Sequence, residues 1–83
     1  MVPKLFVPQI VLTPPQIALC RLIVDGWIDP VATLIGPNHP TAKWFYRQTG
    51  RRITGKCKRF VMREAYNLLA LAGLEEVSGD HFH

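Results

Sequence analysis

Most of the positive charge of this 83-residue chain is carried by one stretch of the sequence. Eight of the ten basic residues fall between positions 43 and 63, and no acidic residue stands among them. They are Lys43, Arg47, Arg51, Arg52, Lys56, Lys58, Arg59 and Arg63. A block of one sign is typical of proteins that bind a polyanion. The block therefore predicts a nucleic-acid or other acidic partner, against the plainer alternative of a charged face that meets only water.

No other set of side chains has the spacing of a catalytic or metal centre. The TGK run at 54–56 lacks the preceding glycine pattern of a phosphate-binding loop, and no His-Glu-x-x-His or Gly-x-Ser-x-Gly motif is present. His81 and His83 could reach a metal only from an extended chain, and they lack further ligands nearby. We therefore predict that the protein is not an enzyme and holds no cofactor or metal.

The elements that position the basic block are predicted to be helical. Residues 1–12 alternate apolar residues with prolines, which predicts an extended arm with a short edge strand at 5–7 or 10–12. Thr13 and Gln16 then have the spacing of a capping box, with proline suited to the first helical position. The apolar stripe of this first helix consists of Ile17, Leu19, Cys20, Leu22, Ile23 and Val24, and Gly26 ends it.

Three more helices follow from the same signals. Asp29 is the expected N-cap of a short second helix over 31–35, which Gly36 and Pro37 end. A third helix begins at Asn38 or His39 and runs to about Gln48, before Gly50. A fourth spans about 56–72 with an apolar face of Phe60, Val61, Ala65, Leu68, Leu69 and Ala72. The fold class is therefore all-α, a small four-helix domain over 13–74 between the arm and a flexible tail at 75–83.

The second and third helices have the pattern of a helix-turn-helix over residues 30–48. Ala32 supplies a small residue where the two helices approach, and Gly36 supplies a turn tolerant of unusual backbone angles. Apolar residues that would pin the third helix follow at Ile35, Ala42 and Phe45. The third helix would then present Thr41, Lys43 and Arg47 to a DNA major groove.

A wider pattern resembles the LuxR-type (GerE-like) DNA-binding domain across about residues 12–74. Leu12, Thr13, Arg21, Leu22, Ile23 and Gly26 stand in the order of that family's opening helix. Thr41-Ala42-Lys43 looks like the family's Thr-Val-Lys on the recognition helix, and Arg63-Glu64-Ala65 with Ala72-Gly73-Leu74 looks like its last helix. The chain departs from the family at Pro37, at Trp44 and in a longer stretch between Thr41 and Ala65.

The resemblance implies a transcriptional regulator that binds double-stranded DNA and forms a homodimer through its last helix. Thr41 and Lys43 would carry over as DNA contacts, and Arg47 joins them because 43 and 47 share a helix face. The cations that follow the third helix would contact phosphates, which set affinity and salt dependence rather than sequence choice. These are Arg51, Arg52, Lys56 and Lys58.

A protein-interaction module is the alternative. Small basic helical proteins, phage-encoded inhibitors among them, can bind and block a larger host protein, including a DNA-binding one. Trp44 and Tyr46, beside the bend that contains His39, would then form a rigid knob for a protein pocket. Phe45 between them is expected in the core.

The two cysteines and the N-terminal residues predict the compartment. Cys20 and Cys57 are too few for a disulfide framework, which favours a reduced, cytoplasmic setting. The prolines of the first twelve residues interrupt the apolar run that a signal peptide would need. No apolar stretch approaches the length of a membrane span, so no membrane partner is expected.

Overall fold

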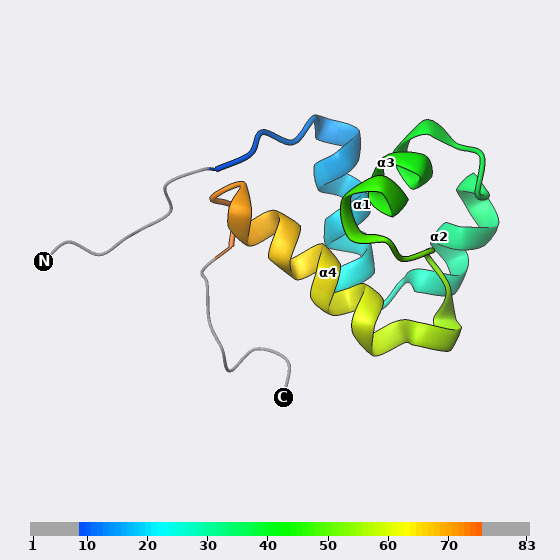
Figure 1. Cartoon of the computed structure of the whole chain (residues 1–83). Helices are drawn as coiled ribbons and strands as arrows, with labels where there is room; N and C mark the ends of the chain where they lie inside the picture. Colours follow the sequence, from blue (N-terminus) through cyan, green and yellow to red (C-terminus); the bar gives the residue numbers. More distant parts are fainter. Residues whose placement is uncertain (1–8, 76–83) are drawn as a thin grey trace, which may run out of the picture.

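A computed structural model describes residues 9–75, and these form an all-α fold without a strand. The helices are α1 (Pro14–Val24), α2 (Ile28–Ile35), α3 (Pro40–Thr49) and α4 (Lys58–Leu71), with a short 3-10 helix, η1 (Gly55–Cys57), before the last. In Figure 1, α4 crosses α1, and α2 and α3 lie to one side of this pair. The all-α prediction is confirmed. The predictions for 1–8 and 76–83, including the strand at 5–7 and the two C-terminal histidines, lie outside the described residues.

The first helix begins as its capping residues predict. The Thr13 hydroxyl accepts a hydrogen bond from the Gln16 backbone N–H at 3.4 Å, and the Gln16 side-chain oxygen accepts from the Thr13 N–H at 2.9 Å. This reciprocal pair satisfies two backbone donors that a helix start leaves open. The buried residues of α1 are Leu19, Cys20 and Ile23. Leu22 is exposed, so the apolar stripe is narrower than the sequence predicts.

The second helix begins earlier than predicted. Its N-cap is Trp27 rather than Asp29, and the first helical residue is Ile28. Ile28 is buried in the core, so packing fixes this start although no side-chain hydrogen bond caps it. Asp29 instead occupies the first turn, where its negative charge interacts favourably with the helix dipole.

The third helix has both predicted ends. His39 is its N-cap, and the imidazole Nδ1 accepts a hydrogen bond from the Thr41 N–H at 3.1 Å. Gly50 ends it with a left-handed φ of 73°, a conformation that glycine adopts without a steric penalty, and donates its N–H to the Tyr46 carbonyl at 2.7 Å.

The fourth helix corrects one predicted core position. Val61, Ala65, Leu68 and Leu69 are buried as predicted, but Phe60 is 45% exposed. Successive helical residues are about 100° apart, so a stripe that passes through 61, 65 and 68 leaves position 60 on the flank. Tyr66 also belongs to the core, although the sequence pattern does not predict it, and it is only 4% exposed.

The segment before α1 is held by the end of α4 and forms no strand at 10–12. The backbone N–H groups of Gln9 and Ile10 both donate to the Leu71 carbonyl, at 2.7 and 3.3 Å. Leu12 is buried in the core, while Val11 points to solvent. The contact satisfies a carbonyl that a helix end leaves without an intrahelical partner. None of the described helices is long and apolar enough to cross a membrane.

The two cysteines lie in opposite environments, which makes them internal probes of the fold. Cys20 is 0% exposed in the core, and Cys57 is exposed at the start of α4. Burial raises the pKa of the Cys20 thiol from its ordinary value of 9.0 to about 12. The folded protein therefore keeps Cys20 as a neutral thiol. As the pH rises from 9.0 toward about 12, the unfolded chain ionises this thiol more readily than the folded protein does, so the free energy of unfolding falls.

We predict that a thiol reagent labels Cys57 rapidly and Cys20 only when the protein unfolds. The thiolate is the reactive form, and Cys20 is both inaccessible and neutral at about pH 8. Mass spectrometry of iodoacetamide-treated protein should show one adduct in native buffer and two in denaturant. Cys57→Ser should then show none in native buffer, and equal labelling of both cysteines in the folded protein would contradict the described core.

Candidate functional site

The exposed face of α3 carries two cations and a tyrosine. Lys43, Tyr46 and Arg47 stand at positions i, i+3 and i+4, and all three are exposed. Phe45 points the opposite way and is 0% exposed in the core. The buried Phe45 ring thus determines which side of α3 faces outward, because side chains three and four apart share one helix face.

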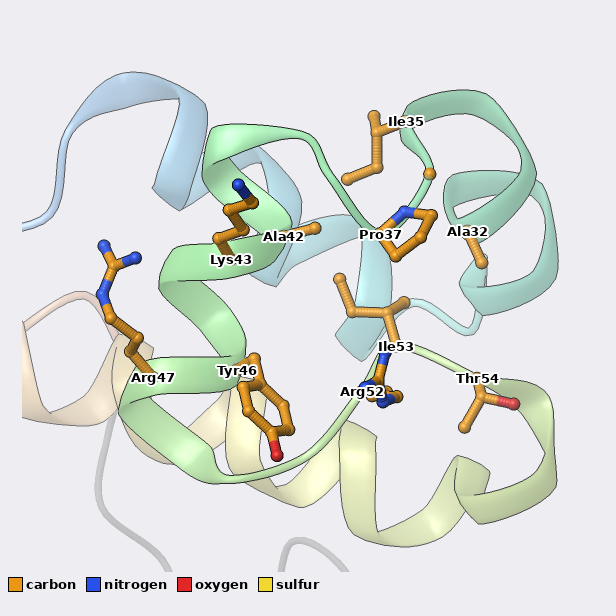
Figure 2. A pocket seen from close by; sticks show the side chains of 11 residues that line it. Ala32, Ile35, Pro37, Ala42, Lys43, Tyr46, Arg47, Arg52, Ile53 and Thr54 are labelled. Atoms are coloured by element: carbon orange, nitrogen blue, oxygen red, sulfur yellow. The ribbon is translucent and has the colours of Figure 1, made fainter.

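A cavity of about 480 Å³ lies beside this face, between the end of α2, α3 and the loop that follows α3. Figure 2 shows the small apolar side chains around the space that these three segments enclose. The lining residues without charge are Ala32, Ile35, Gly36, Pro37, Ala42, Tyr46, Ile53 and Thr54. The sequence predicts that Ala32 lies where α2 and α3 approach closely and that Ala42 pins α3 to α2, but the structure leaves space beside both residues.

Three of the predicted DNA-contacting cations lie at the edge of this cavity. Lys43 and Arg47 line it from α3, and Arg52 lines it from the loop. The Arg52 guanidinium carbon lies 5.4 Å from the centre of the Tyr46 ring, a cation–π contact that joins the loop to the helix. Within the described part of the chain, no carboxylate lines the cavity. The fold therefore places three cations at the edge of an apolar space, with the Lys43 and Arg47 side chains extending away from Ala32 and Pro37 (Figure 2).

A second aromatic ring holds two further arginines. The guanidinium carbons of Arg51 and Arg63 lie 4.6 and 5.5 Å from the centre of the Phe60 ring. Arg51 comes from the loop after α3 and Arg63 from α4, so Phe60 connects these two segments. The apolar pattern of α4 predicts Phe60 in the core, but the structure places its ring at the surface in contact with two guanidinium groups.

The remaining predicted site residues lie apart from the cavity lining. Thr41 is half-buried in the first turn of α3, where its N–H is engaged by His39. Lys56 is exposed in η1, and Lys58 is exposed as the first residue of α4. The eight basic residues are thus distributed over α3, the loop, η1 and α4 rather than along one helix face.

The residues proposed for a protein knob are only partly available. Trp44 is half-buried and packs against the core, with its ring edge-on to Phe45 at a centroid distance of 6.3 Å and an angle of 62°. His39 caps α3, which confirms its expected role at the helix start. Tyr46 alone of the three combines an exposed ring with a place on the cavity wall.

The fold brings one acid to the basic block that the linear sequence separates from it. Asp29 lies against Gly55, since a Cβ atom placed on this glycine would be only 2.6 Å from the Asp29 Oδ1 atom. Gly55 therefore permits the N-terminal turn of α2 to approach η1. Asp29 stands fourteen residues before Lys43, the first residue of the block, and nothing in the sequence predicts its contact with Gly55.

An ion pair between described residues joins Arg21 of α1 and Glu75, at 3.7 Å. Both partners lie outside the stretch from 43 to 63. Among the block's cations, the contacts described for Arg51, Arg52 and Arg63 are to aromatic rings rather than carboxylates.

We predict that Phe60→Leu lowers the free energy of unfolding by about 1 kcal/mol, because leucine keeps an apolar side chain but cannot attract guanidinium groups through a ring face. Phe60→Tyr keeps the ring and should stay close to the wild-type value. Urea denaturation of the three proteins at one salt concentration measures the difference. Equal midpoints for the leucine and tyrosine variants would show that the ring–arginine contacts contribute nothing.

Comparison of the chain with protein-family models, with curated proteins and with solved structures gives no match. The resemblance to the LuxR-type domain thus depends on the sequence pattern of residues 12–74 alone.

Proposed function

We propose that this protein binds double-stranded DNA, with α2 and α3 acting as a helix-turn-helix and α3 entering the major groove. The observation that carries the proposal is the exposed face of α3, where Lys43 and Arg47 lie side by side and Arg52 joins them from the loop. An α-helix of this kind fits the width of the major groove, and a cationic face is attracted to the phosphates beside it.

The attachment of α2 and of α3 to the core supports this proposal. Val31 and Phe45 are buried and fix the two helices to the core. Gly36 ends α2 with a φ of 70°, which lets the chain turn sharply toward the start of α3. The predicted pins Ile35 and Ala42 are half-buried on the cavity wall, so Phe45 is the anchor among the three.

The site residues divide by the contacts that their chemistry allows. Arg47 can donate two parallel hydrogen bonds to a guanine edge, whereas Lys43 and Thr41 suit a single base atom or a phosphate. The cations beyond α3 would contact the backbone on either side of the groove and set the affinity. These are Arg51, Arg52, Lys56 and Lys58.

Pairing through α4 belongs to the same proposal. Phe60, Leu71 and Leu74 are exposed apolar residues on α4 and the turn after it. Two copies that joined these apolar residues would place two α3 helices on one DNA duplex, as a dimeric transcriptional regulator requires. The alternative of a small inhibitor that binds a larger protein draws its support from the cavity rather than from Trp44, which is half-buried.

We predict that the protein binds a random-sequence duplex at low salt and that affinity falls steeply toward physiological salt. Lys43→Ala and Arg47→Ala should each reduce the slope of log affinity against log salt by about 1, since each removes one cation that would neutralise a phosphate of a random-sequence duplex. Fluorescence anisotropy of a labelled duplex measures both effects.

Arg21→Ala is the matched control for these two variants. It removes the same charge from an exposed side chain on α1, outside the proposed interface. Its loss should cost little stability because a surface ion pair contributes about 0–1 kcal/mol. No binding at low salt, or an equal effect of all three substitutions, would contradict the proposal.

A further inference from the structure

The cavity between α2, α3 and the following loop combines two chemistries in one site. Its volume of about 480 Å³ lies within the range of ligand-binding pockets, about 300–1,000 Å³. The walls are formed mainly by aliphatic groups from Ala32, Ile35, Pro37, Ala42 and Ile53. An apolar group that entered this space would be removed from water, which is favourable in proportion to its apolar area.

The cations around the cavity restrict what can enter it. Lys43, Arg47 and Arg52 line the space together with these aliphatic groups, and none of the described lining residues is acidic. A neutral apolar ligand would leave the three charges without partners, and a purely anionic ligand would leave the apolar walls in water. Charge complementarity therefore selects an occupant with an apolar centre and flanking negative charges.

The walls favour an amino-acid side chain over a nucleobase. A base that entered the cavity would lose water from its polar edges and would need hydrogen-bond partners there. The three cations of the lining can only donate hydrogen bonds, and the Thr54 hydroxyl oxygen already accepts one from the Lys56 N–H at 3.2 Å, so the N–H groups of a base would find few acceptors. A leucine or phenylalanine side chain has no such requirement.

We propose that this cavity binds an acidic segment of a partner protein through one bulky apolar side chain. The apolar side chain fills the space beside Ala32, Ala42 and Ile53, and carboxylates on either side pair with Lys43, Arg47 and Arg52. This interaction is a function separate from DNA binding. A consequence, which rests on the proposed DNA binding, is that the acidic segment and DNA compete for the same three cations.

The test is a nuclear magnetic resonance titration of the full-length, isotope-labelled protein with a synthetic peptide, Gly-Asp-Glu-Asp-Leu-Asp-Glu-Asp-Gly. We expect chemical-shift changes centred on Ala32, Gly36, Ala42 and Ile53, with saturation that yields a dissociation constant. A second peptide with serine in place of the leucine keeps every charge and should bind about tenfold more weakly, the loss expected for one buried apolar side chain.

Two alanine-to-leucine variants distinguish the contribution of the cavity to peptide binding from the contribution of the cations. Ala32→Leu places a larger side chain in the cavity and should weaken the leucine peptide about tenfold, without removing a cation. Ala18→Leu makes the same change on an exposed position of α1 and should have no effect. Circular dichroism and retained binding of the serine peptide show that Ala32→Leu is folded.

Each other outcome overturns the proposal in an identifiable way. Equal affinity for the two peptides, shifts away from the cavity, or no shifts at millimolar peptide would exclude an apolar anchor. A dimer in sedimentation that Ala32→Leu dissociates would assign the cavity to a second copy of this chain. Addition of a DNA duplex tests the competition separately, because peptide binding without DNA binding would leave this inference intact and remove the proposed function.

Discussion

The burial of Phe45 is the interaction on which the exposed surface of this protein depends. Its ring is fully removed from water in a core to which all four helices contribute. Replacing such a buried aromatic ring by alanine costs about 3–5 kcal/mol in other proteins, a large part of the stability of a chain this short. Because Phe45 fixes the rotation of α3, Lys43, Tyr46 and Arg47 must face outward, and any rotation that hid them would expose the phenylalanine.

Aromatic rings hold three arginines of the basic block. The sequence supplies no carboxylate between positions 43 and 63. The faces of Tyr46 and Phe60 hold Arg52, Arg51 and Arg63. A ring attracts a guanidinium group without cancelling its charge, so these cations are oriented and still available to an anionic partner.

The same three cations serve both proposals because the cavity opens beside the exposed face of α3. DNA would meet Lys43, Arg47 and Arg52 as a surface, whereas an acidic peptide would meet them around an apolar space. The two proposals therefore make DNA and an acidic peptide competitors for the same cations.

The helices could be predicted from sequence signals, because caps, prolines and glycines act over a few residues. The Thr13–Gln16 box, the His39 cap and the Gly50 end needed no tertiary contact, and all are confirmed. The charge of the block and the burial of Phe45 could be predicted as well. The start of α2 at Ile28, the exposure of Phe60 and the cavity could not be predicted, since each depends on segments distant in sequence. The contact of Asp29 with Gly55 is an example, because it joins residues that are far apart in the sequence. A local pattern determines which face of a helix is apolar. The space left between helices depends on how the side chains of all the helices pack together.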